Sequence, residues 1–342
     1  MTIPLMIVTV LSAGLVCWHL AAWPILLRRL AKDPEAPPAL DATDPSGWPS
    51  IAVVIPAHDE ARWIAEKIAN IAALDYPADR LRLVIALDGC ADDTRERAEA
   101  ALKAREAAHL RAEIVENPRN IGKLATLDRR IGEADEDIVA LSDASAILSL
   151  DALTLAAAHF ADAALGAVGG SYVLFAENAE SEAGFWSSQT AVKRAEAAIG
   201  APMGLHGAFY AFQRSLYEPL PPDTINDDFS LPMSLVERGW RVAYEPRINA
   251  VELEASSVAM DFRRRRRIGA GNMQQSLRHW RLLDPRRPGV ALAFASGKGV
   301  RPLIPAAMLL ALLGSIALSP VSPLFAAAAA AQGAGYLSVG IA

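Results

Sequence analysis

Short apolar runs and longer amphipathic stretches follow one another through the middle of the chain. "SIAVVIPAHDE" begins with the pattern of a buried strand, and "EARWIAEKIANIAAL" has helical spacing. "LRLVIALDGCADDT" with "TRERAEAALKARE", and "AEIVENPRNIGK" with "LATLDRRI", repeat this order, and "DIVALSDASAIL" adds a fourth strand. The alternation predicts an α/β fold with a mostly parallel sheet and right-handed crossovers.

Long apolar runs stand at both ends of this predicted domain. Residues 3–27 are long enough to cross a bilayer, and Arg28, Arg29 and Lys32 follow them. This order favours an uncleaved anchor over a signal peptide, with its C-terminal side in the cytoplasm. We expect an N-terminal transmembrane anchor over 1–28, a linker over 29–47, a cytoplasmic domain over 48–285, an interfacial segment over 286–301 and one or two transmembrane helices over 302–342.

Composition narrows the classes of protein that fit this pattern. Hydrophobic residues make up 52% of the 342 positions, and the excess lies mostly at the two ends. The net charge of −6 argues against a nucleic-acid-binding protein. Cys17 and Cys90 are the two cysteines, too few for a disulfide framework, which suits a reducing compartment.

Charged side chains follow the predicted strands at the points where the strands end. Asp59 and Glu60 follow the first strand, Asp88 the second, Lys123 the third and Asp143 the fourth. In open α/β sheets, ligands bind beyond the carboxyl ends of the strands. The sequence contains neither a GxGxxG nor a Walker A pattern, so a dinucleotide or ATP site loses its main support.

Two adjacent acids, Asp227 and Asp228, precede the helical pattern of "FSLPMSLVERG". Carboxylates at a helix start accept orphan N–H groups and favour the positive end of the helix dipole. A carboxylate held there is also rigidly mounted and can take a proton from a substrate. The residues alone leave both roles open.

Six motifs in order resemble the membrane-bound inverting glycosyltransferases of family 2, to which hyaluronan, chitin and cellulose synthases belong. They are "VVIPAHDE", "LDGCADDT", "NPRNIGK", "SDAS", "HGAFYAFQR" and "NDDFSLPMSLVERGW", and the similarity covers about residues 50–275. The resemblance implies a GT-A fold that binds a nucleotide-sugar. We expect a UDP-sugar donor, a lipid-linked or saccharide acceptor, and a catalytic domain on the cytoplasmic face of a bacterial inner membrane.

The resemblance also assigns donor-binding positions. Asp88 is expected to contact the base or ribose, with a helix-capping acid as the alternative. Asp59 stands where the family has Asn, and with Glu60 it is expected to line the uridine pocket. Lys123 is expected to face the diphosphate, with a solvated lysine as the alternative. The full expected set is Ala57, Asp59, Glu60, Asp88, Lys123, Asp143, Gly207 and Arg267.

Asp143 is the first acid of the family's Asp-X-Asp motif, and Ser145 replaces the second. Mg²⁺ or Mn²⁺ accepts carboxylate and phosphate oxygens together and neutralises the leaving diphosphate. One hydroxyl in place of a charged ligand weakens such a site. We expect a metal held weakly by Asp143, Ser145 and the diphosphate.

Asp228 matches the last acid of the family's Thr-Glu-Asp helix, and Asp227 takes the place of Glu. The resemblance makes Asp228 the general base for the acceptor hydroxyl and Asp227 its electrostatic neighbour. His206 is interpreted either as a pocket residue or as a packed one. A segment expected on the acceptor side carries Trp186, Gln189, Lys193 and Glu196.

"DFRRRRRIGAGNMQQ" occupies the place of the Gln-X-X-Arg-Trp motif of processive relatives. Alignment on Arg267 puts Arg264 in place of Gln and Ile268 in place of Trp, so no aromatic face is left to hold a polymer. We therefore expect a non-processive enzyme, although a homo-oligomer could form a pore. The five arginines are alternatively a topogenic cluster. The alternative function is a catalytically silent membrane protein that keeps the fold for assembly or regulation.

Overall fold

The computed structural model describes residues 2–31, 37, 39–40, 47–174, 180–254 and 258–341. Within these ranges, the side chains of 180–187, 258–261, 263–265 and 339–341 are not described. The side chains of Trp186 and Arg264, both named above, therefore lie outside the described part.

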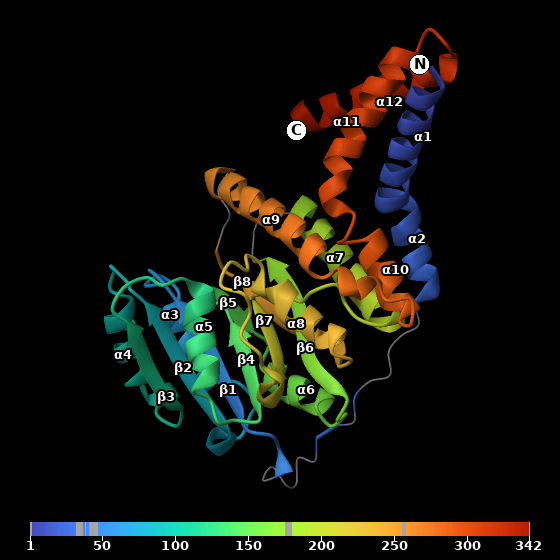
Figure 1. Ribbon diagram of the computed structural model, residues 1–342. Coiled ribbons are helices and arrows are strands. Elements are labelled where there is room, and N and C mark those ends of the chain that lie inside the picture. Colours follow the sequence, from blue (N-terminus) through green and yellow to red (C-terminus); the bar gives the residue numbers. More distant parts are fainter. Residues whose placement is uncertain are drawn as a thin grey trace.

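In the described part of the chain, eight strands form one sheet in the order β3-β2-β1-β4-β7-β6-β8-β5 (Figure 1). Parallel pairs join β1 to β2 and β4, β2 to β3, and β6 to β8, whereas β7 and β5 run antiparallel to their neighbours. The predicted α/β class is confirmed, with a mixed sheet. The strands are β1 (Ile51–Ala57), β2 (Leu81–Asp88), β3 (Arg111–Asn117), β4 (Ile138–Ser142), β5 (Ala146–Leu148), β6 (Leu165–Leu174), β7 (Phe209–Gln213) and β8 (Arg241–Glu252).

Helices cover both faces of this sheet. On β1, Ile51, Val53 and Ile55 face one core cluster, and Ala52 and Val54 face the other. Successive strand residues point to opposite faces, so a strand buried on both faces is apolar throughout. The first face is covered by α3 (Ile64–Ala72), α4 (Thr94–Leu102) and α6 (Ala152–His159), and the second by α5 (Lys123–Gly132), α7 (Glu180–Ile199) and α8 (Asp227–Glu237).

The segment predicted as one fourth strand consists of two strands separated by the loop that carries Asp143 and Ser145. β4 pairs with β1, but β5 pairs antiparallel with β8. The buried Lys67 joins the two ends of this loop, because its Nζ donates to Ser142 Oγ (2.7 Å) and to the carbonyl of Ala146 (2.5 Å). The loop is therefore held firmly between the centre of the sheet and its edge.

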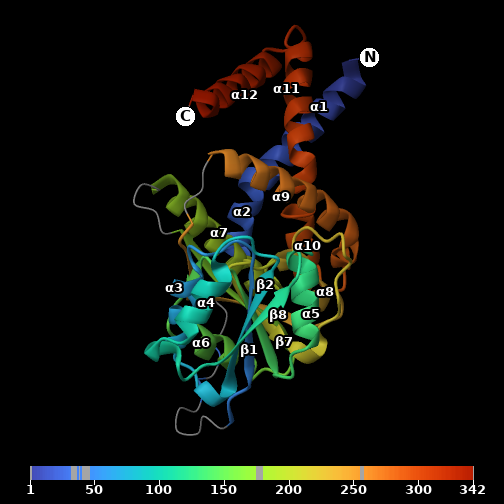
Figure 2. The ribbon, with the colours of Figure 1, turned by 90° about the vertical axis from the view of Figure 1, so that its left-hand side faces the viewer.

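Apolar helices extend beyond the sheet domain, and α1 and α11 lie side by side in both views (Figures 1 and 2). Two described stretches, Thr2–Leu30 and Pro288–Leu318, are long and apolar enough to cross a membrane. The helices in and near them are α1 (Thr2–Cys17), α2 (Trp23–Leu30), α9 (Val258–Arg278), α10 (Pro288–Ser296), α11 (Ile304–Leu318) and α12 (Pro323–Ile341).

The contact between α1 and α11 is polar and small, and their outer surface is apolar. Thr9 is buried against Gly314, where an added Cβ would come within 2.0 Å of the threonine hydroxyl. In contrast, Leu11 is 67% exposed and Leu313 is 54% exposed. Small residues between helices and large apolar residues outside are typical of packing in a lipid bilayer. This arrangement indicates membrane association.

The ends of these apolar segments also belong to the core of the sheet domain. Trp23 and Leu27 of α2, and Val290 and Phe294 of α10, are buried in the core cluster of the second face. His19 adds a contact of 2.9 Å between its Nδ1 and the carbonyl of Ser296. The core thus continues past the boundary expected at residue 285, and the interfacial position of 286–301 stays a prediction.

Candidate active site

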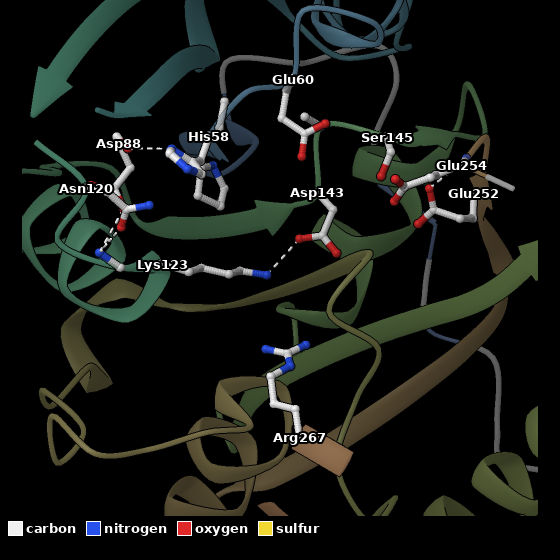
Figure 3. A pocket seen from close by; sticks show the side chains of 14 residues that line it. His58, Glu60, Asp88, Asn120, Lys123, Asp143, Ser145, Glu252, Glu254 and Arg267 are labelled. Atoms are coloured by element: carbon white, nitrogen blue, oxygen red, sulfur yellow. Dashed lines mark hydrogen bonds and ion pairs between the residues drawn. The ribbon is translucent and has the colours of Figure 1, made fainter. Parts of the chain in front are cut away.

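A cavity of about 470 Å³ opens at the carboxyl ends of β1, β2 and β4 (Figure 3). The loops after these strands form most of its wall, and the segment from β3 into α5, the end of β8 and α9 complete it. Every expected donor-binding residue except Asp59 and Gly207 lines it. The lining residues are Pro56, Ala57, His58, Glu60, Asp88, Asn120, Gly122, Lys123, Asp143, Ala144, Ser145, Glu252, Glu254 and Arg267.

Asp88 is almost fully buried, and its carboxylate holds the loop that leads to α5. The backbone N–H groups of Ile121 (2.9 Å) and Gly122 (2.8 Å) donate to it. Burial raises the pKa of Asp88, but the hydrogen bonds outweigh this effect and lower the pKa below its ordinary value. The acid that accepts the N–H of Thr94 at the start of α4 is Asp92 (3.1 Å). Asp88 therefore organises the cavity wall in addition to lining it.

Lys123 points across the cavity to Asp143, and the two form an ion pair of 2.7 Å between Nζ and Oδ1 (Figure 3). Both side chains are partly exposed, at 40% and 35%. Burial lowers the pKa of Lys123, but Asp143 and Asp227 outweigh this and raise it, so the ammonium stays charged. Lys123 thus offers a positive charge inside the cavity rather than in bulk solvent.

Carboxylate and hydroxyl oxygens that are able to bind a metal gather at the end of the cavity near Asp143. The pairing of β5 with β8 brings Glu252 and Glu254 to the cavity wall, and the N–H of Leu253 donates to the carbonyl of Ser145 (3.0 Å). Burial, followed by the charges of Glu254 and Asp143, raises the pKa of Glu60 to about 7. Hard oxygen donors of this kind fit Mg²⁺ or Mn²⁺.

The sequence analysis missed Glu252 and Glu254, which add carboxylates where Ser145 lacks one. The signal available in the sequence is the pair of acids in "VELEA", at the end of an apolar run. That run does not say which strand it pairs with, and only the pairing brings these acids to the cavity.

Asp227 and Asp228 occupy the first turn of α8, and Asn226 is the N-cap residue without a side-chain capping bond. Asp227 accepts a long hydrogen bond of 3.4 Å from the Tyr210 hydroxyl. In the described part of the chain, no hydrogen bond reaches the carboxylate of Asp228, which is half-buried. Burial and the neighbouring Asp227 raise the pKa of Asp228. A carboxylate with these properties is suited to accept a proton.

Pro232 gives α8 an irregularity that ties Asp228 to a loop. Proline has no N–H, so the carbonyl of Asp228, four residues earlier, loses its helical partner. The N–H of Leu205 takes this place, with an N to O distance of 2.8 Å. The chain from 203 to 207 is thereby joined to the start of α8.

Lys193 and Glu196 of α7 hold the same loop from the other side. Lys193 Nζ donates to the carbonyls of Gly204 (2.6 Å) and Met203 (3.3 Å), and Glu196 accepts the N–H of Met203 (2.9 Å). Both side chains are buried, at 8% and 4% exposure. These residues fix Met203 and Gly204, and their expected place on the acceptor side stays a prediction.

Gly207 lies close to both Asp143 and Asp228. A Cβ added there would lie 3.7 Å from Asp143 Oδ2 and 3.8 Å from Asp228 Oδ2. The absence of a side chain at this position therefore lets the carboxylates of Asp143 and Asp228 come near the same point, although neither Gly207 nor Asp228 lines the cavity described above.

Three other expected positions differ in their surroundings. Asp59 does not line the cavity, and its carboxylate instead accepts the N–H of Ala91 (2.7 Å). His206 is stacked on Tyr172 with ring centroids 5.9 Å apart, as the packed interpretation expects. Arg267 of α9 is exposed and lines the cavity, which suits diphosphate recognition.

Comparison with known proteins agrees with this fold. The sequence profile of glycosyltransferase-like family 2 matches residues 49–271. An N-acetylglucosaminyltransferase from Mesorhizobium japonicum is 27% identical over 271 residues, which is 73% of this chain and 62% of the relative. A poly-β-1,6-N-acetyl-D-glucosamine synthase from Staphylococcus aureus is 29% identical over 206 residues, which is 57% of this chain and 48% of the relative.

Among solved structures, a mannosyltransferase from Pyrobaculum calidifontis in complex with GDP-Man and Mn²⁺ superposes with a TM-score of 0.74. It is 25% identical, and the match covers 96% of this chain and 92% of that one. The chain has a GT-A fold with a nucleotide-sugar site, and it belongs to glycosyltransferase family 2. Membership of this family supports glycosyltransferase activity, and divalent metal use is consistent with the Mn²⁺ complex.

Proposed function

We propose that the enzyme transfers a sugar from a nucleotide-sugar to an acceptor hydroxyl with inversion at the anomeric carbon, and that Asp228 is the general base. The observation that carries this proposal is that the carboxylates of Asp143 and Asp228 both come close to Gly207. In the proposed complex the donor's diphosphate lies at Asp143 and the acceptor hydroxyl at Asp228, on opposite sides of the anomeric carbon. Inversion in a single displacement needs this arrangement, because the acceptor attacks from the side opposite the leaving group.

The residues of the chain divide the work as follows. Asp228 accepts the proton of the acceptor hydroxyl as the oxygen attacks, and Asp227 keeps the pKa of that base raised. Lys123 and Arg267 contact the leaving diphosphate. Glu60 and the backbone at Ala57 line the nucleotide side of the cavity, beside Asp88.

A divalent cation would be held at Asp143, Ser145 and the nearby glutamates Glu252 and Glu254. When bound, Mg²⁺ or Mn²⁺ supplies neutralisation of the charge on the diphosphate. Lys123 forms its ion pair with Asp143 at the same end of the cavity, so the lysine stays close to the negative charge that develops there.

We further propose a UDP-sugar as donor and an acceptor at the cytoplasmic face of a bacterial inner membrane. The choice of UDP rests on the family resemblance of the sequence motifs; the named relative is an N-acetylglucosaminyltransferase, and the Pyrobaculum protein binds GDP-Man. Ile268, 36% exposed on α9, supplies no aromatic surface for a growing polymer. We therefore propose addition of one or a few sugars to a lipid-linked or saccharide acceptor.

Replacement of the base tests the mechanism. Asp228→Asn keeps the shape of the site but removes the proton acceptor, so turnover should fall by roughly 10²-fold or more, with binding of UDP unchanged by calorimetry. NMR of the wild-type product from an α-linked donor should show a β linkage. Asp151→Asn, at the exposed start of α6 and outside the cavity, is the matched control. Near-normal turnover of Asp228→Asn, or an α-linked product, would refute the mechanism.

A further inference from the structure

Three metal-ligating side chains of two different loops converge beside the nucleotide side of the cavity. His58 and Asp59 belong to the loop after β1, and Cys90 belongs to the loop after β2. One ligand atom from each lies within 4.8 Å of the other two. The cluster is accessible, since the side chains of His58 and Asp59 are 46% and 44% exposed and Cys90 is half-buried.

The hydrogen bonds of His58 decide which of its nitrogens is free. Nδ1 lies 2.8 Å from the backbone carbonyl of Asp88, and a carbonyl only accepts, so Nδ1 carries the proton. In a neutral imidazole, Nε2 then has a lone pair. Nε2 lies 3.8 Å from Asp59 Oδ2, too far for a hydrogen bond. The Cys90 thiol donates to the carbonyl of Ala57 (3.5 Å), and its sulfur keeps its lone pairs. An imidazole nitrogen, a carboxylate oxygen and a sulfur thus lie within 4.8 Å of one another, and each can bind a cation.

The surroundings of these side chains resemble the outer shell of metal ligands. A ligating histidine usually donates its other N–H to a carbonyl or carboxylate, and ligating carboxylates are themselves hydrogen-bonded. His58 donates to the carbonyl of Asp88, and Asp59 Oδ1 accepts the N–H of Ala91 (2.7 Å). Asp59 also has φ 56°, in the left-handed region, and it is the one described non-glycine residue with positive φ. Backbone strain of this kind concentrates at functional positions.

The chemistry of the donors separates this cluster from the oxygen site at Asp143. Nitrogen, oxygen and sulfur together suit Zn²⁺, which is four-coordinate with these ligands, whereas Mg²⁺ and Mn²⁺ prefer oxygen. We propose that His58, Asp59 and Cys90 form a second metal site, for Zn²⁺ with an open fourth position, which ties the two loops together. As the zinc–sulfur bond forms, the proton of the Cys90 thiol passes to solvent. The proposal does not depend on the transferase mechanism.

The location gives this site a structural consequence. His58 lines the cavity, and its partner carbonyl belongs to Asp88, which holds the next loop. A metal bound at the cluster links the loop after β1 to the loop after β2, and both belong to the nucleotide side of the cavity. Binding to the folded state alone should also raise the melting temperature.

Cobalt spectroscopy on the purified full-length protein, with thiols reduced, tests the proposal. Co²⁺ bound through a thiolate absorbs in the near ultraviolet, so a titration should show this band, and one equivalent of Zn²⁺ should abolish it. Cys90→Ser should abolish the band, and His58→Gln should weaken metal affinity at least tenfold. Cys17→Ser is the matched control, since Cys17 is the other cysteine, in α1, and this variant should bind as the wild type does. Asp143→Asn should also keep the band.

Two readouts guard against misfolded variants. Circular dichroism should show the wild-type spectrum for Cys90→Ser and His58→Gln. In a thermal scan, Zn²⁺ should raise the melting temperature of the wild type and of Cys17→Ser, and it should not raise that of Cys90→Ser or His58→Gln. Absence of the band in the wild type would overturn the proposal. Retention of the band in Cys90→Ser, or its loss in Cys17→Ser, would overturn it equally.

Discussion

Lys193→Met should damage both stability and turnover, because this lysine is buried and joins α7 to the loop beside the candidate base. Its ammonium donates to the carbonyls of Gly204 (2.6 Å) and Met203 (3.3 Å). Methionine keeps the volume but removes the charge and both hydrogen bonds. The carboxylate of Glu196, 4% exposed on the next turn of α7, then loses the positive charge that acts on it most strongly.

The magnitude follows from the hydrogen bonds that are lost. The buried carbonyls of Met203 and Gly204 lose their donor, and leaving a buried polar group unsatisfied costs about 1–3 kcal/mol. Lys298 and Arg301 still lie near Glu196, so a total of about 3 kcal/mol is expected. At roughly 2–4 °C per kcal/mol for a domain of this size, the melting temperature should fall by about 6–12 °C.

Turnover should fall further than stability alone explains. The loop that Lys193 holds continues through Leu205, which binds the carbonyl of Asp228, to Gly207 beside both carboxylates. A misplacement of about 1 Å in such a site can cost roughly 10²-fold in rate. We therefore expect a fall in kcat with little change in UDP affinity, measured below the melting temperature of the variant.

Two further variants decide whether this reasoning is correct. Lys193→Met combined with Glu196→Gln should recover part of the lost stability, because residue 196 then no longer carries a buried negative charge. Lys103→Met, at the exposed end of α4, is the matched control and should change neither quantity. A melting temperature within 2 °C of wild type, together with unchanged kcat, would show that Lys193 and Glu196 do not hold the loop.

Two other predictions concern charge in the cavity. Ser145→Asp should tighten binding of Mn²⁺, and Asp143→Ala should weaken nucleotide binding in the presence of Mn²⁺; calorimetry measures both. Activity that survives a chelator would show that the reaction does not need the metal. Burial and nearby acids raise the pKa of Glu60 to about 7, so the group gains its proton as the pH falls through that value and the cavity loses a negative charge. Without metal, UDP should therefore bind more tightly below pH 7 than above it, and Glu60→Gln should remove this dependence; a pH profile that the variant keeps would contradict it.

Local pattern was sufficient for the first half of the domain. From β1 to β4, apolar runs and amphipathic stretches alternate, and parallel strands place their carboxyl ends at one edge of the sheet. That rule places Asp88, Lys123 and Asp143 at one edge of the sheet, and all three line the cavity there. The apolar ends could also be predicted from the sequence, because length and composition alone identify a helix that is able to cross a bilayer.

Pairing and packing between distant segments decided the rest. An apolar run in the sequence indicates a buried strand, but it does not indicate which strand is its neighbour. The antiparallel pairing of β5 with β8, which brings Glu252 and Glu254 to the cavity wall, is therefore known only from the folded structure. The same holds for the apolar ends: Trp23 of the expected anchor and Phe294 of the expected interfacial segment are buried in the core of the sheet domain. Lys193 gives the physical reason most clearly. Its neighbours in the sequence do not predict that it lies beside the carbonyls of residues 203 and 204. A buried polar group needs a hydrogen-bond partner, so Lys193 binds these carbonyls only because the fold buries it next to them.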